Sequence, residues 1–178
     1  DFIAHAPIFV LATSDGSGRV DVSPKGGPAG FVSVLDDHHL AFADMAGNNR
    51  LDSLQNVVAC DAVSLLFFVP GVGETLRVVG KASVSTTPEV LERCSLGQMA
   101  ARIAVVVEVT TAYLHCAKAL KRSGLWEPDR WPEIADMAPP AQMLRDHTGT
   151  PRATEEVQRA LDESYATATW AMGGIAGG

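Results

Sequence analysis

Short apolar runs separated by turn residues dominate the first 109 positions of the chain. Several of them alternate apolar and polar residues, as RVDVS at 19–23 and TLRVVGKASVST at 75–86 do. This period of two is typical of strands with one buried face. The runs predict about seven β-strands, at 8–13, 19–23, 30–35, 39–43, 61–71, 75–86 and 103–109. Because short turns join most of them as hairpins, the pattern predicts an antiparallel barrel.

Helical spacing interrupts this pattern in a few places. Leu51, Leu54 and Val58 form one apolar stripe behind Asn49, which is a good N-cap. Pro88 opens a short segment that predicts a second helix ending at Cys94.

The last third of the chain has a different character. The basic segment 113–126 predicts a helix up to Ser123-Gly124, and segment 126–140, rich in Pro and aromatic residues, predicts an extended loop. A polar linker at 147–154 then precedes a final amphipathic helix on which Val157, Leu161 and Tyr165 share one face.

Composition limits the possible partners. The 178 residues carry a formal net charge of −7, which opposes general nucleic-acid binding. Three cysteines without metal-like spacing predict neither a disulfide framework nor a metal site, and they favour a cytoplasmic protein. No apolar run reaches the roughly 20 residues that span a bilayer. The chain opens at Asp1 without Met, so we expect a few starting residues to precede it.

Two cationic positions suggest an anion site. Lys25 lies in the turn SPKGGP beside Ser23, where Gly and Pro let the backbone approach a ligand closely. Asn49 and Arg50 stand where a helix begins, and unpaired N–H groups at such a point attract anions. Together these residues predict a site for a phosphorylated small molecule.

A second basic group follows at Lys118, Arg122 and Trp126, which are spaced by four residues and share one face if the helix continues. That face is either a solvated surface with Trp126 as a packing anchor, or the rim of an anionic ligand site. Adjacent His115 and Cys116 point in different directions on a helix, so we expect a hydrogen-bonded histidine and a buried cysteine.

Four blocks of the chain carry a family resemblance. They are LATSDGSGRVDVSPKGGPAGFV at 11–32, GNNRLDSLQNV at 47–57, PGVGETLRVVGKA at 70–82 and YLHCAKALKRSGLW at 113–126. In this order they resemble the flavin-binding split-barrel superfamily typified by pyridoxamine 5′-phosphate oxidase, and more narrowly its bacterial FMN-dependent group. The resemblance covers about 2–146, so 1–146 is expected to be the FMN-binding domain. Residues 147–178 are expected to be a linker and helix packed on the barrel or on a dimer partner.

The resemblance implies a six-stranded antiparallel split barrel that forms a homodimer with FMN at the interface. It places phosphate-binding residues at Asn49 and Arg50, with Lys25 and Ser23 as supplements because Asn replaces a basic residue. Backbone groups of Gly30, Phe31 and Val32 would face the flavin ring. It places Thr75 and Arg77 near the point where the partner subunit reaches the cofactor. If the basic helix face is a ligand rim, Lys118 and Arg122 would surround the cofactor phosphate or an anionic substrate, and Trp126 could stack on the flavin ring.

The function that this resemblance implies is an FMN-dependent oxidoreductase acting on a small molecule. No acid–base dyad or nucleophile stands out in the sequence, and none is required, because the flavin carries the chemistry. The alternative is a non-catalytic module that holds flavin, haem or the deazaflavin F420. The net charge of −7 speaks against the long acidic tail of F420.

Overall fold

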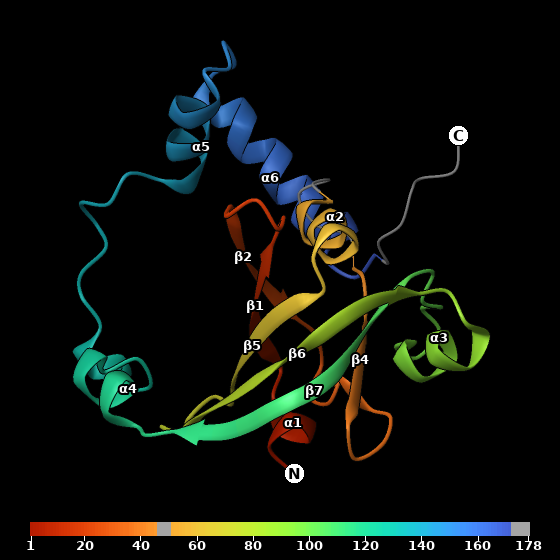
Figure 1. Cartoon of the computed structure of the whole chain (residues 1–178). Helices are drawn as coiled ribbons and strands as arrows, with labels where there is room; N and C mark the ends of the chain where they lie inside the picture. The colour runs from red at the N-terminus through yellow and green to blue at the C-terminus, as the bar shows by residue number, and fades with distance from the viewer. Residues whose placement is uncertain (46–50, 172–178) are drawn as a thin grey trace.

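The computed structural model describes residues 1–45 and 51–171 (Figure 1). Their strands form one antiparallel sheet in the order β2-β1-β5-β6-β7-β4-β3, which curls without closing and is a split barrel. The strands are β1 Ile8–Ser14, β2 Val20–Gly26, β3 Ser33–Val34, β4 His39–Ala43, β5 Ala62–Phe68, β6 Thr75–Ser85 and β7 Ala104–His115. The predicted fold class is therefore confirmed, with the two-residue β3 as a seventh strand.

Alternating residues of the sheet build the core. Phe9, Leu11, Leu65 and Phe67 are at most 1% exposed, while their neighbours along each strand are partly exposed. The ring of Phe9 lies 5.0 Å from that of Phe67 and 4.9 Å from that of Phe42. This inner face gives the molecule its stability, since burying each of these side chains contributes about 1.5–3 kcal/mol.

Short helices flank the sheet. The helices are α1 Phe2–His5, α2 Asp52–Ala59, α3 Pro88–Cys94, α4 Lys118–Ser123, α5 Pro140–Thr148 and α6 Thr154–Ala168, with a 3-10 turn η1 at Pro128–Arg130. Helix α2 packs against β1 and β6 and buries Val57. The predicted helix at 88–94 is confirmed as α3.

A β-bulge bends β6, as the glycine in its middle predicts. The register between β6 and β7 shifts at Val79 and Gly80. A Cβ atom on Gly80 would lie 2.2 Å from the carbonyl oxygen of Glu108, so only glycine fits there without a backbone shift.

The helix expected to begin at Tyr113 does not form there. Strand β7 continues to His115, and residues 113–115 pair with residues 75–77 of β6. The six-residue α4 begins only at Lys118. Sheet pairing along β6 satisfies the backbone of this segment and overrides its weak helical preference.

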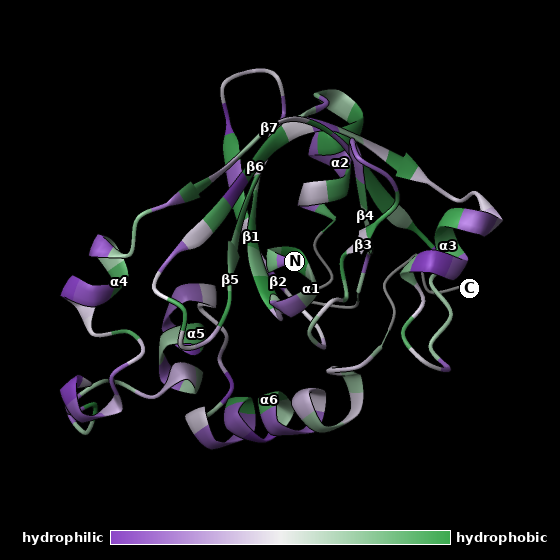
Figure 2. Ribbon diagram, turned by 90° about the horizontal axis from the view of Figure 1, so that it is seen from below, coloured by the Kyte–Doolittle hydropathy of each residue, from purple (hydrophilic) through white to green (hydrophobic). Residues whose placement is uncertain are grey.

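The C-terminal helix is confirmed as α6. Within the linker expected at 147–154, residues 149–153 are not helical, but a helix that the sequence did not predict, α5, precedes them. Helix α5 begins at Pro140 and ends at Thr148, with its proline in the first turn where the missing N–H costs nothing. The two helices pack on each other (Figures 1 and 2), and α5 buries Ala141 while α6 buries Val157. The main packing partner of α6 is thus α5, not the sheet.

Candidate functional site

A pocket of about 450 Å³ lies between β5, β6 and β7 on one side and α4 on the other. Its apolar wall comes from Leu66 and Phe68 of β5 with Ala119 and Leu120 of α4. Its polar groups belong to Thr75, Arg77, His115, Cys116, Lys118 and Arg122. The pocket therefore combines an apolar wall with a cluster of cationic side chains.

Strand register places this pocket on the outer face of the sheet. Leu66 of β5 pairs with Arg77 of β6, and Arg77 pairs with Tyr113 of β7. Directly paired residues share a face, and the neighbouring row through Phe67 faces the core. The pocket is consequently separate from the filled interior of the barrel.

Four of the predicted cofactor residues meet in this pocket. Thr75 and Arg77 come from the start of β6, and Lys118 and Arg122 stand one turn apart on α4. The hydroxyl-bearing Thr75 is only 7% exposed, whereas both α4 cations are exposed. Arg77, Lys118 and Arg122 give this pocket a local positive charge on a chain whose net charge is −7.

Arg77 is oriented by an aromatic neighbour. Its guanidinium donates a hydrogen bond to the hydroxyl of Tyr113 at 3.3 Å, and its Cζ atom lies 5.9 Å from the centre of the Tyr113 ring. The same ring lies 5.0 Å from the imidazole of His115. Tyr113 thus holds Arg77 and His115 side by side along the outer face.

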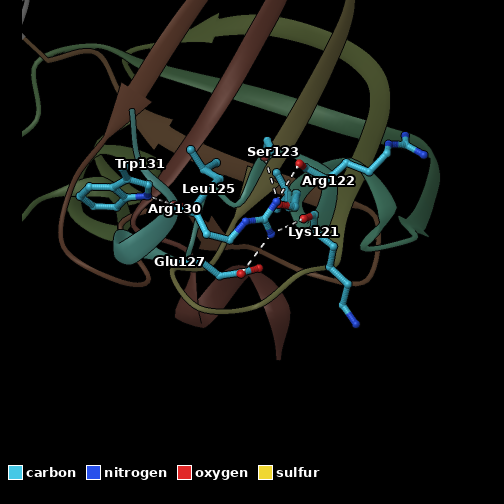
Figure 3. Close-up of polar contacts among 8 residues, drawn as sticks. Lys121, Arg122, Ser123, Leu125, Glu127, Arg130 and Trp131 are labelled. Atoms are coloured by element: carbon cyan, nitrogen blue, oxygen red, sulfur yellow. Dashed lines mark hydrogen bonds and ion pairs between the residues drawn. The ribbon is translucent and has the colours of Figure 1, made fainter. Parts of the chain in front are cut away.

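The C-terminal end of helix α4 contacts Arg130, a residue that the sequence did not single out (Figure 3). The Arg130 guanidinium donates hydrogen bonds to the carbonyls of Lys121 at 3.1 Å and Arg122 at 3.3 Å, and pairs with Glu127 at 3.0 Å. A cation at a helix C-terminus satisfies its free carbonyls and opposes the helix dipole. Gly124 ends the helix with a φ of 64°, and a Cβ there would come within 3.2 Å of Arg130.

The expectations for His115 and Cys116 are both wrong. Cys116 is exposed rather than buried. His115 Nε2 is buried and has no hydrogen-bond partner, alone among the buried side-chain nitrogen and oxygen atoms of the described residues. Both differences arise because the pair lies at the end of β7 beside α4, and not within a helix.

The predicted residues Ser23 and Lys25 do not reach this pocket. They lie on edge strand β2, where Ser23 pairs with Leu11 and Lys25 pairs with Phe9. Both partners belong to the core face, so Ser23 and Lys25 lie on the face opposite the pocket. Within one chain the two groups of predicted residues are therefore separate.

Lys25 has an acidic neighbour in Asp44, which follows β4. Burial raises the pKa of the Asp44 carboxyl above 3.8, and the positive charge of Lys25 opposes this rise. The carboxylate of Asp44 partly neutralises the cation that the sequence assigns to a phosphate.

The segment expected to face a flavin ring adjoins the core. Phe31 and Val32 are 5% and 3% exposed, and the Phe31 ring stacks on Phe9 at 5.6 Å. Gly30 has a φ of 80°, and its Cβ position would lie 3.2 Å from the carbonyl oxygen of Ala4. The predicted phosphate residues Asn49 and Arg50 lie outside the described residues.

Trp126 lies beyond the end of α4 and does not line the pocket. Its indole N–H donates a hydrogen bond to the carbonyl of Val72 at 2.9 Å. The side chain therefore ties the segment after α4 to the loop before β6, as expected of a packing anchor.

The family model described as "Pyridoxamine 5'-phosphate oxidase" matches residues 1–126. The chain belongs to this family. The match includes every strand, the pocket and α4, and it ends before Arg130, α5 and α6. The search of curated proteins finds no match.

Solved structures share the fold at low identity. The chain is similar to HupZ of Group A Streptococcus, at 17% identity over 64% of this chain and 88% of that one, with a TM-score of 0.52. An F420 reductase matches at 20% identity, 62% and 93% coverage and a TM-score of 0.45. General Stress Protein 26 of Bacillus anthracis matches at 14% identity, 64% and 87% coverage and a TM-score of 0.44. The likeness to HupZ concerns the fold alone.

Two further features of the described residues bear on ligands and surroundings. Their His, Cys, Asp and Glu side chains nowhere gather in groups of three or more that could hold a metal ion. Among the same residues, no helix is both long enough and apolar enough to span a bilayer.

Proposed function

We propose that the chain binds FMN in the pocket beneath α4 and acts as an FMN-dependent oxidoreductase on a small molecule. The observation that carries this proposal is the meeting of Thr75, Arg77, Lys118 and Arg122 in one pocket. All four are among the residues that the sequence and its family resemblance predict to bind the cofactor.

The pocket fits a phosphorylated, flat heterocycle. Its volume of about 450 Å³ falls in the usual range for small-molecule sites, roughly 300–1,000 Å³. Arginine and lysine supply charge-assisted hydrogen bonds to a phosphate. Leu66 and Phe68 supply an apolar surface on which a ring can lie. FMN has both of these parts.

A bound flavin supplies the hydride or electron transfer. The tasks left to the chain are to hold the phosphate at the α4 cations, to orient the ring against β5, and to exclude water from it. This division of labour needs no general acid or base in the pocket.

We further propose a cytoplasmic homodimer. The outer face beside the pocket exposes apolar residues of β1 and β2, with Ile8, Val22 and Val20 at 37%, 61% and 70%. An apolar face of this kind is typical of a protein–protein contact. Within one chain, Lys25 and the pocket lie on opposite faces of the sheet. A second copy would bring its own β2 edge, with Lys25, to the pocket of the first. Three free cysteines fit a reducing compartment.

The test is a visible absorption spectrum of the purified protein, with mass spectrometry of any small molecule released on denaturation. FMN in the released fraction, or saturable uptake of added FMN, supports the proposal. F420 or haem would retain the pocket and replace the cofactor. A colourless protein that takes up none of the three contradicts cofactor binding.

Turnover separates the enzyme from the binding module. With FMN bound, NADH or NADPH is added without oxygen and the visible flavin absorbance is followed. Bleaching supports an oxidoreductase, and a constant spectrum with either donor favours a module that only holds its cofactor.

A further inference from the structure

The pocket has charged, exposed residues at its rim and less exposed residues on the side of the sheet. Lys118 and Arg122 on α4 are exposed, while Arg77 is half-buried and Thr75 is 7% exposed. Leu66 and Phe68, on the sheet side, are half-buried. An anionic group keeps its hydration best at the exposed cations, and an apolar ring gains most against the sheet. This gradient orients a ligand with its anion outward and its ring inward.

His115 belongs to the sheet side of this gradient. It pairs with the buried Thr75 in the β6–β7 register and lines the pocket beside Cys116. Its Nε2 atom is buried and has no partner among the described residues. Leaving such an atom unpaired is costly, and most buried polar atoms in native proteins are paired.

We infer that His115 Nε2 is a recognition group for the heterocyclic ring of the pocket's ligand, with which it forms a hydrogen bond. This inference rests on the proposed function, and it adds which part of the ligand His115 contacts. The ring nitrogen donates or accepts according to its tautomer, and a flavin ring offers both kinds of partner.

A displacement of helix α4 would let the ligand reach His115 Nε2. The helix has six residues and most of them are exposed, so a small displacement costs little. On binding, the ligand replaces an unpaired atom by a hydrogen-bonded one. The cost present in the free protein is thereby removed in the complex, which increases selectivity for rings with a suitably placed heteroatom.

Two ligands that differ only in the phosphate separate the contributions of His115 and the cations. Dissociation constants for FMN and for riboflavin are measured by flavin fluorescence with the wild-type chain and with His115→Leu, His115→Gln and Arg122→Gln. We expect His115→Leu to weaken both ligands by a similar factor of about tenfold. Arg122→Gln should weaken FMN alone. His115→Gln, whose amide reaches toward the Nε2 position, should recover part of the loss, and His38→Leu on an exposed hairpin serves as the control.

The stability of the ligand-free protein gives a second readout. Removing an unpaired buried polar atom is neutral or stabilising when an apolar group of similar size replaces it. We therefore expect the melting temperature of ligand-free His115→Leu to equal or exceed that of the wild type. A purely structural histidine would give the opposite shift, so a clear loss of stability in this variant overturns the inference.

The remaining outcomes also decide between the two proposals. If the wild type binds flavins and His115→Leu leaves both affinities unchanged, the contact is wrong and the proposed function stands. If His115→Leu weakens FMN but not riboflavin, His115 reads the phosphate and the inference is overturned. A wild-type chain that binds neither flavin overturns the proposed function and this contact with it.

Discussion

The pocket under α4 and the β2 edge make a useful comparison, because the sequence assigned residues of both to one cofactor. Thr75, Arg77, Lys118 and Arg122 meet on the outer face of the sheet. Ser23 and Lys25 project from the core face of the edge strand β2, which β1 and β5 separate from β6. Both regions carry a hydroxyl and a cationic side chain, yet only the first group lines a pocket within one chain.

This difference shows what a second chain would contribute. One polypeptide cannot bring opposite faces of its own sheet to one ligand, but a symmetric partner can place its β2 edge against the pocket. The β2 group either completes the pocket across a dimer or has no part in it. The following experiments distinguish these possibilities, beginning with the largest expected effect.

Removing the pocket cations should abolish tight FMN binding. The changes are Arg77→Gln, Lys118→Gln and Arg122→Gln. Each should remove roughly 1 kcal/mol of binding free energy, so the triple variant should bind FMN about 100-fold more weakly. Riboflavin, which has no phosphate, should lose far less. Fluorescence titration measures both, and Lys121→Gln, on the same helix but outside the pocket lining, is the matched control. Equal losses for the two flavins would contradict phosphate binding by these cations.

Mixed dimers test whether the two regions serve one cofactor. A chain with the three pocket changes is combined with a chain carrying Lys25→Glu and Arg50→Glu, and the mixed species is purified through two different tags. If a site takes its halves from two subunits, one of the two sites in each mixed dimer is intact. We expect about one FMN per mixed dimer, against little or none in either parent dimer. An empty mixed dimer would exclude a shared site.

Loss of Arg130 should weaken FMN binding, although Arg130 does not line the pocket. Arg130→Ala leaves the carbonyls of Lys121 and Arg122 without their side-chain donor. The Arg130 contacts are exposed, so we expect a loss of about 1 kcal/mol, or roughly fivefold in FMN affinity. Arg152→Ala, an exposed arginine near the start of α6, is the control. The rate of amide hydrogen exchange should rise in α4 and stay unchanged in β2.

Asp44→Asn probes the β2 edge with the smallest expected effect. Burial raises the pKa of this carboxyl in the folded state, so between its unfolded and folded pKa values the folded protein holds the proton more tightly. The contribution of the Asp44 carboxyl to the free energy of unfolding is therefore greatest below pH 3.8, and it falls as the pH rises from there through the pKa of the folded state. Asp44→Asn should melt slightly higher than the wild type at neutral pH and show no gain below pH 3.8.

The same substitution bears on the role of Lys25. Without the neighbouring carboxylate, the Lys25 cation is less neutralised, and FMN affinity should rise if Lys25 contacts phosphate. An unchanged affinity, with the expected stability gain, would restrict Lys25 to a structural role.

The sequence predicts much of this fold because its strands alternate clearly. RVDVS at 19–23 and the long run at 75–86 both become strands, and even the bend at Gly80 was predictable from a glycine in a strand interior. Helix α5 was missed because Pro139 and Pro140 suggested a loop, although proline is favourable in a first helical turn. Residues 113–115 were assigned to a helix because only pairing with β6 makes them a strand.

The candidate site was predictable in its residues but not in its geometry. Charge and spacing identified Lys118 and Arg122, and the family resemblance identified Arg77. Which face of the sheet each residue occupies depends on register, which a single sequence specifies only weakly. For the same reason, neither the unpaired His115 nor the contact of Arg130 with α4 could be anticipated.

The contacts of Arg130 also bear on where the functional unit ends. The family match stops at Trp126, four residues before the side chain that fixes the C-terminal end of α4. A chain shortened to that boundary would keep every strand and every pocket residue, but would leave the last carbonyls of α4 open to water. Cutting after Trp131 instead would preserve them. The smallest piece that keeps the C-terminal end of α4 capped is therefore longer than the part that this protein shares with its family.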